Sequence, residues 1–140
     1  MDVLGAAASV IAVVELSAKV AKLCVQYSRE VKGARNEIAR LHSEVNKLKT
    51  VVEDVQHLIN RLDKGKLSAS QKVVDAIGDC LTQLKELDKR LDPGTTRKAM
   101  SRFGVRALRW PFDSKEVDKV IGDLERCKGM ISLALQVDQT

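Results

Sequence analysis

The chain has 140 residues and a mass of 15.4 kDa, which is enough for one domain with a single core. Its content of 44% apolar and 31% charged residues is typical of a globular protein, whereas 3% aromatic residues argues against a β-sandwich or barrel. The net charge of +5 favours an anionic partner. Because its two prolines, Pro93 and Pro111, leave a long N-terminal stretch without this helix breaker, we expect an all-α fold.

Two helices are predicted in the first half of the chain. The first runs from about Asp2 to Lys32, and Gly33 marks a break or kink. The second runs from about Ala34 to Lys64, with Gly65 in a suitable place for its C-cap. In the second helix apolar residues recur at alternating spacings of three and four, which is typical of a helix that packs through one face. These residues are Ile38, Leu41, Val45, Leu48, Val52, Val55, Ile59 and Leu62.

Two further helices are predicted in the second half. The third begins near Ser68, where Gln71 completes a capping-box pattern, and ends at the stop signal Asp92-Pro93-Gly94. The fourth begins at Asp113, and Glu116 follows three residues later in the same pattern. Their apolar stripes comprise Val73, Ile77, Cys80, Leu84, Leu87 and Leu91 in the third helix, and Val117, Val120, Leu124, Cys127, Ile131 and Ala134 in the fourth, where Ile121 and Leu135 widen the stripe.

Long helices joined by short connections predict an antiparallel four-helix bundle. The exception is the stretch from Pro93 to Phe112, which holds basic residues and no acidic ones, so we expect a short extra basic helix or loop between the third and fourth helices. Its aromatic cluster, Trp110-Pro111-Phe112, is expected to cover one end of the bundle or to serve as an interface. We interpret residues 1–140 as a single helical-bundle domain, and we expect it to be cut from a longer protein.

The first helix departs from the usual pattern because its front half is apolar on every side. Along its rear half, water-facing residues recur at spacings of four and three: Glu15, Lys19, Lys22, Gln26 and Arg29. The same spacing carried backwards gives Ile11, Ala8 and Leu4. No helix of a four-helix bundle is surrounded on all sides, so these residues are hard to bury. Three explanations stay open: the stretch from Arg97 to Phe112 covers them, they form a dimer contact, or they enter a membrane.

We favour the third explanation and predict a membrane-active segment at residues 1–14. Its uncharged run, Val3 to Val14, is shorter than the roughly 20 residues that span a bilayer as a helix. The residues predicted to insert are Val3, Leu4, Ala8, Ile11 and Val14, and the small residues predicted to allow close helix packing are Gly5, Ser9 and Ala12. The predicted contacts with anionic lipid are Lys19, Lys22, Arg29, Arg97, Lys98, Arg102, Arg106 and Arg109.

The sequence contains no motif for catalysis or for a cofactor. It has no glycine-rich phosphate loop and no Gly-x-Ser-x-Gly, and the spacing of His42 and His57 does not suit metal ligands on a helix. Cys24, Cys80 and Cys127 form no Cys-x-x-Cys pair and are expected to be reduced, buried thiols. We therefore expect a protein that is not an enzyme and that uses no cofactor, no metal and no nucleic-acid partner.

Two segments carry a family resemblance. One is Leu-Gly-Ala-Ala-Ala-Ser-Val-Ile-Ala-Val-Val at residues 4–14, and the other is Leu108-Arg109-Trp110-Pro111-Phe112 followed by a helix that ends with residues 131–138. Both resemble fungal HeLo-like domains, the N-terminal cell-death domains of NOD-like receptors of the STAND class. The resemblance covers nearly the whole chain and extends to the bundles of necroptosis effectors and plant helper immune receptors.

This resemblance implies a regulated cell-death effector that is cytoplasmic at rest and forms homo-oligomers on activation. It implies that the apolar helix, Leu4 through Val14, then inserts into the plasma membrane, with Glu15 at the acidic position that often follows such a segment. A NOD-like receptor or an amyloid-signalling protein is the implied partner. The alternative is an adaptor domain of a NOD-like receptor that uses the same apolar surface for protein–protein contacts or oligomerisation, without membrane activity.

Overall fold

Four helices form an antiparallel bundle in the computed structural model, which describes residues 3–61, 71–92 and 109–139. They are α1 (Val3–Glu30), α2 (Arg35–Arg61), α4 (Gln71–Leu91) and α6 (Ser114–Gln139). The predicted all-α fold is confirmed, and the described residues include no strand. Residues 93–108 of the basic stretch and the predicted start of the third helix at Ser68 lie outside the described residues.

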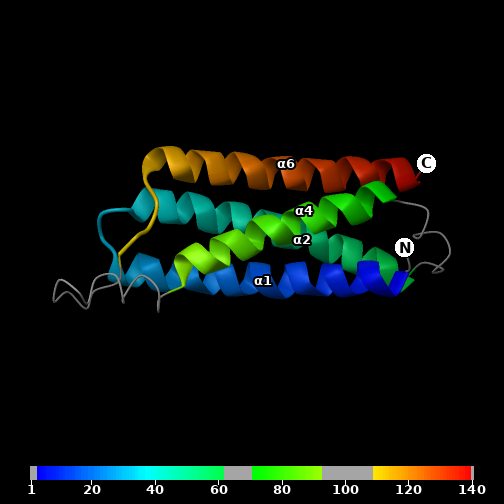
Figure 1. Cartoon of the computed structure of the whole chain (residues 1–140), viewed down its shortest axis with the longest axis horizontal. Coiled ribbons are helices and arrows are strands. Elements are labelled where there is room, and N and C mark those ends of the chain that lie inside the picture. Colours follow the sequence, from blue (N-terminus) through cyan, green and yellow to red (C-terminus); the bar gives the residue numbers. More distant parts are fainter. Residues whose placement is uncertain (1–2, 62–70, 93–108, 140) are drawn as a thin grey trace.

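Each helix packs on two neighbours. Helices α1 and α6 both pack closely against α2 and α4, so α1 and α6 occupy opposite corners of the bundle. Consecutive helices run in opposite directions, which brings the start of α1 and the end of α6 to the same end of the bundle (Figure 1). As a consequence, each helix has one face toward the core and one toward solvent.

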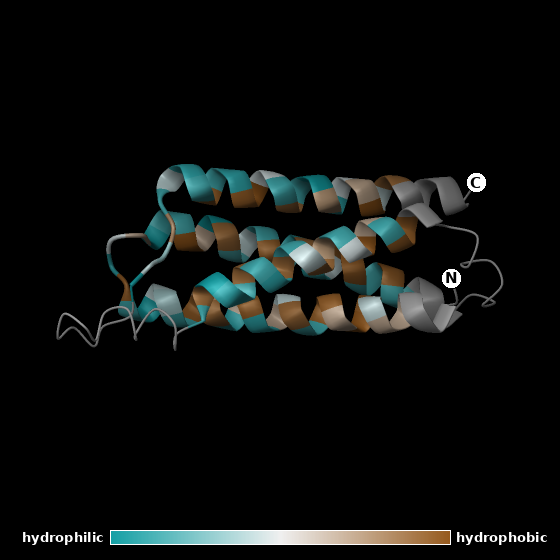
Figure 2. Ribbon diagram, in the orientation of Figure 1, coloured by the Kyte–Doolittle hydropathy of each residue, from teal (hydrophilic) through white to brown (hydrophobic). Residues whose placement is uncertain are grey.

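The predicted apolar stripes form the core. All six predicted stripe residues of α4 are buried, as are those of α2 from Ile38 to Val55. In α6, Val120 is only half-buried, and Ile121 takes a place in the core beside Leu124. Hydrophobic and hydrophilic residues accordingly alternate along each ribbon as the helix turns (Figure 2). Burying each large aliphatic side chain contributes about 1.5–3 kcal/mol, so these stripes supply most of the driving force for folding.

The aromatic cluster covers the bundle end where α1 stops and α6 starts, as predicted. Trp110 and Phe112 are buried, with their ring centroids 5.2 Å apart. Trp110 also lies edge-on to Tyr27 of α1 at 5.3 Å. The Tyr27 hydroxyl donates a buried hydrogen bond of 2.9 Å to the carbonyl of Leu91, the last residue of α4. This end of α1 is therefore held by ring packing and by a hydrogen bond to the neighbouring helix.

The predicted capping box at the start of α6 is also confirmed. The amide of Glu116 donates to Asp113 Oδ1 at 2.8 Å, and the amide of Asp113 donates to Glu116 Oε1 at 3.3 Å. Glu37 of α2 accepts hydrogen bonds from Trp110 Nε1 at 3.1 Å and from Ser114 Oγ at 2.6 Å. These bonds satisfy donors at the start of α6 and fix it against α2.

The hydrogen bond of Tyr27 gives a test of how firmly this end is held. Tyr27→Phe keeps the ring packing but deprives the buried Leu91 carbonyl of this donor, and we expect it to lower the free energy of unfolding by about 1–3 kcal/mol. Urea denaturation measures the change. Thr82→Ala is the control, because it removes an exposed hydroxyl that bonds within α4 only, to the Gly78 carbonyl. Equal stability of Tyr27→Phe and wild type would contradict this account.

Candidate functional site: the outer face of α1

The front part of α1 has an apolar outer face as well as an apolar inner face. Val10 and Val13 are buried in the core, whereas Ala8 and Ile11 are exposed, Ile11 at 45%. Within the described residues, therefore, nothing covers Ala8 and Ile11. Val14 is half-buried and packs against the core, so it lies between the two faces.

The remaining residues of the predicted segment contribute less to this surface. Ser9 and Ala12 are half-buried, and Glu15 is exposed at the end of the apolar run. Val3, Leu4 and Gly5 belong to α1, but their side chains lie outside the described part of the structure. The observed apolar outer surface thus consists of Ala8 and Ile11, with Val14 at its edge.

The first basic residue after this surface is held by another helix. Lys19 Nζ lies 3.0 Å and 3.1 Å from the two carboxylate oxygens of Asp88 on α4. The Lys19 side chain is 61% exposed, so this ion pair is worth at most about 1 kcal/mol. Lys19 can therefore contact a lipid headgroup only in competition with Asp88.

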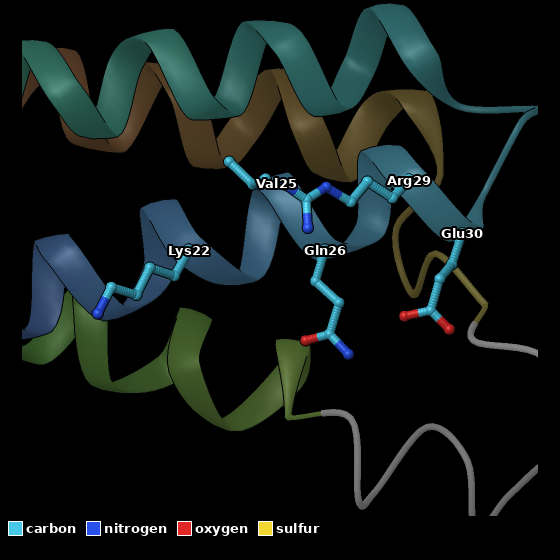
Figure 3. A pocket seen from close by; sticks show the side chains of 5 residues that line it. All are labelled: Lys22, Val25, Gln26, Arg29 and Glu30. Atoms are coloured by element: carbon cyan, nitrogen blue, oxygen red, sulfur yellow. The ribbon is translucent and has the colours of Figure 1, made fainter.

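A shallow groove of about 430 Å³ follows on the same helix. It is lined by Lys22, Val25, Gln26, Arg29 and Glu30, and all five side chains project from α1 (Figure 3). Lys22 and Arg29 are exposed, and the exposed apolar side chain of Val25 lies between them in the sequence. The groove combines two cations and one anion with an apolar floor, which suits contact with an anionic surface more than binding of a small molecule.

The other predicted lipid contacts are less clearly placed. Arg109 is exposed directly before the buried Trp110. Arg97, Lys98, Arg102 and Arg106 lie outside the described residues. The structure consequently brings Lys19, Lys22 and Arg29 together on α1 and leaves the contribution of the basic stretch as a prediction.

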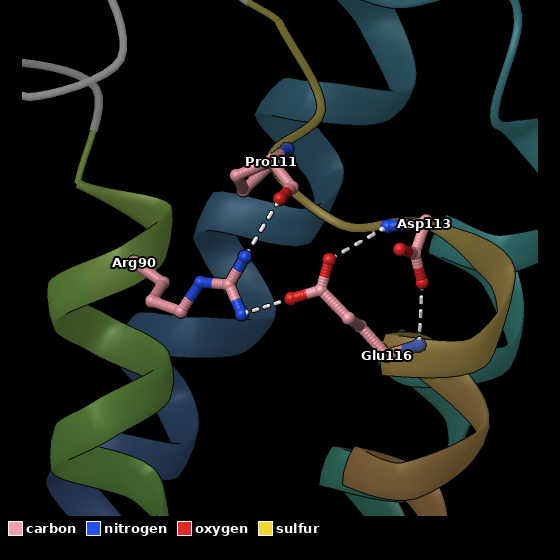
Figure 4. A network of polar contacts seen from close by, with 4 residues as sticks. All are labelled: Arg90, Pro111, Asp113 and Glu116. Atoms are coloured by element: carbon pink, nitrogen blue, oxygen red, sulfur yellow. Dashed lines mark hydrogen bonds and ion pairs between the residues drawn. The ribbon is translucent and has the colours of Figure 1, made fainter.

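A second groove, of about 320 Å³, lies between α4 and α6, and its residues hold these two helices together. Its apolar floor includes Leu87, Phe112 and Val120, and its polar rim carries both charges. At one end Arg90 pairs with Glu116 and donates to the Pro111 carbonyl at 2.8 Å (Figure 4). The Arg90 guanidinium also stacks over the Phe112 ring, 4.3 Å from its centroid. These contacts join α4 to the start of α6. Sequence patterns identified the capping box here but gave no signal for the arginine, which comes from a distant segment.

The three cysteines are buried and free, as predicted. Burial raises the pKa of Cys24 to about 12. A hydrogen bond between the Cys80 and Cys127 thiols, across the contact of α4 with α6, raises the pKa of Cys80 and lowers that of Cys127. Among the described side chains, no group of three His, Cys, Asp or Glu is arranged to hold a metal ion.

The following findings concern membrane-spanning helices and the similarity of this chain to known proteins. In the described part of the chain, no helix has the length and apolarity needed to cross a bilayer. The model of one protein family, described as pigment biosynthesis cluster protein PigL N-terminal, matches residues 1–138. No curated protein and no solved structure matches the chain. The resemblance to HeLo-like domains is therefore still a prediction.

The contact of Arg90 with Glu116 predicts a pH dependence of stability. The hydrogen bond from Arg90, followed by that from the Asp113 backbone, lowers the pKa of Glu116 below its usual 4.5. Its ionised form therefore stabilises the fold above that pH, and this contribution is lost as the pH falls through the lowered pKa. We expect Glu116→Gln to lower the melting temperature at neutral pH and to match wild type in strong acid.

Thermal unfolding followed by circular dichroism at both pH values makes this comparison. Glu86→Gln is the control, because Glu86 is an exposed carboxylate on the rim of the same groove. A difference between Glu116→Gln and wild type that is the same at both pH values would show that ionisation of Glu116 is not what stabilises the start of α6.

Proposed function

The chain belongs to the PigL N-terminal family, and for this member we propose a role as a regulated cell-death effector that inserts the N-terminal part of α1 into the plasma membrane. In this proposal the protein is cytoplasmic at rest and forms homo-oligomers on activation. A NOD-like receptor or an amyloid-signalling protein would supply the signal, as the resemblance to HeLo-like domains implies. The activity is not enzymatic and needs no cofactor.

The exposure of Ile11 is the observation that carries the proposal. Residues 3–14 hold no charge, and the outer position at residue 11 is filled by an isoleucine that is 45% exposed. On α1 itself the corresponding positions of the rear part hold Lys22 and Arg29. An apolar outer face followed by a basic one is typical of a helix that contacts a membrane surface, with its apolar end in the acyl region and its cations at the headgroups.

The free energy of moving the front part of α1 to lipid has terms of both signs. Val10 and Val13 are buried both in the bundle and in a bilayer, but their removal exposes the core side chains that they cover. Ala8 and Ile11 are exposed in the bundle and become buried only in lipid, which stabilises the inserted form by about 25 cal/mol per Å² of apolar surface. Lys22 and Arg29 add roughly 1 kcal/mol each at an anionic leaflet. In an oligomer the favourable terms of all copies act together.

The alternative function is that of an adaptor domain without membrane activity. Ala8 and Ile11 are then covered by a protein partner or by a second copy, and the groove on α1 that is lined by Lys22 and Arg29 is a solvated surface. The two functions differ in their target, since only the first predicts leakage of anionic liposomes. The same set of variants therefore separates them.

Substitution of Ile11 tests the proposed insertion. Because this side chain is exposed, Ile11→Glu is expected to leave the fold intact and to reduce dye release from anionic liposomes at least tenfold, since a carboxylate in the acyl region costs more than about 2 kcal/mol. Met130→Glu on α6 is a matched control, because Met130 is also a large hydrophobic side chain and is 43% exposed. Liposome leakage assays, with circular dichroism to check folding, make the comparison.

Two outcomes of this experiment would overturn the proposal. One is unchanged leakage by folded Ile11→Glu. The other is an absence of leakage by wild type, combined with a stable dimer or complex that Ile11→Glu dissociates, which would favour the adaptor.

Substitution of the two cations of the groove on α1, Lys22 and Arg29, tests its contact with anionic lipid. The double variant Lys22→Gln and Arg29→Gln removes two charges worth roughly 1 kcal/mol each, so we expect binding to anionic vesicles to weaken by about thirtyfold and to depend less on salt. Vesicle co-sedimentation at several salt concentrations measures this. The control replaces Lys85 and Lys89, two exposed lysines of α4, by Gln. Equal losses in the two double variants would show that net charge, rather than the groove on α1, determines binding.

A further inference from the structure

The core of the bundle contains one polar side chain without a partner among the described residues. Ser17 of α1 is fully buried, and its hydroxyl makes no hydrogen bond. The other buried polar residue, Glu44 of α2, is paired with Lys128 of α6 at 3.2 Å. A buried hydroxyl that has lost its hydrogen bonds to water and gained none in return destabilises the folded state. Ser17 is therefore a local defect in the packing of α1.

The position of Ser17 divides α1 into two parts. Before it, the described side chains that meet the core are all apolar: Val10 and Val13 are buried, and Val14 and Leu16 are partly buried against the core. After it, Lys19 pairs with Asp88, and Tyr27 is bonded to Leu91 and packed against Trp110. Among the described side chains, the front part is thus held by apolar contacts alone, and the rear part by apolar contacts together with polar bonds.

We propose that Ser17 sets how easily the front part of α1, residues 3–17, separates from the bundle. When this part opens, the hydroxyl regains hydrogen bonds to water. The unpaired hydroxyl therefore destabilises only the closed form. Opening therefore relieves the defect in water. This inference deepens the proposed function and rests on it for its biological consequence.

Ser17→Ala tests the inference, because it removes the hydroxyl and keeps the Cβ atom. We expect it to raise the melting temperature by about 3 °C or more, and to slow hydrogen exchange of the amides of residues 7–14 by about tenfold. Dye release from anionic liposomes should slow as well, because the closed form no longer contains an unpaired hydroxyl.

Gly78→Ala on α4 is the matched control. Gly78 is exposed within the helix, and an added Cβ would meet nothing within 4 Å. Alanine in place of a helical glycine stabilises the fold to a similar extent, but in α4 rather than in α1. We therefore expect Gly78→Ala to raise the melting temperature while leaving both the exchange at residues 7–14 and the rate of dye release as in wild type.

Each result has a defined meaning. Unchanged exchange in Ser17→Ala would overturn the inference, and so would slower exchange with an unchanged rate of dye release. If Gly78→Ala slows exchange at residues 7–14 as much as Ser17→Ala does, the segment opens by global unfolding and the inference is again wrong. An absence of dye release by wild type would instead refute the proposed function, and the exchange measurement would still show whether Ser17 controls opening.

Discussion

A helix at the corner of a four-helix bundle can bury only the face that it turns toward its neighbours, so apolar residues on its outer face stay in contact with water. Helix α1 packs on α2 and α4 and buries Val10, Val13 and Val20 in the core, whereas Ala8 and Ile11 stay exposed. The proposed insertion into lipid would bury this exposed apolar surface, because both faces of the helix are then covered.

The same helix is held unequally along its length. At its C-terminal end Tyr27, Trp110 and Leu91 join α1 to α4 and to the segment that precedes α6. The front part lacks contacts of this kind among the described residues and ends at the unpaired hydroxyl of Ser17. A bundle built in this way can release one end of α1 while the aromatic cluster keeps the other end in place. The contrast between the two ends connects the packing of the core with the proposed insertion step.

Local patterns in the sequence predicted most of the fold. The stripes of α2 and α4 and the capping box at Asp113 depend on residues three or four positions apart, which share a face in any helix. Helix ends were less predictable, since α1 ends at Glu30 rather than near Lys32. The last helix-type hydrogen bond runs from the Val31 amide to the Tyr27 carbonyl at 2.8 Å.

The candidate site was predictable only in part, because its details depend on how the helices pair. The spacing rule placed Ala8 and Ile11 on the outer face, where the structure has them. It gave no signal that Asp88 would hold Lys19 or that Arg90 would pair with Glu116, since both contacts join different helices. Nor did it distinguish Ser17 from a serine that finds a partner, because that difference is set by the surrounding core.

The position of residue 11 relative to a bilayer tests the central claim most directly. An environment-sensitive fluorophore attached at Ile11→Cys, with vesicles of anionic lipids brominated along their acyl chains, reports whether this residue reaches the hydrocarbon region. The same label at Met130→Cys provides the reference on α6. The account predicts quenching and a blue shift at residue 11 and neither at residue 130. Equal, water-like emission at both positions in the presence of bound vesicles would contradict it.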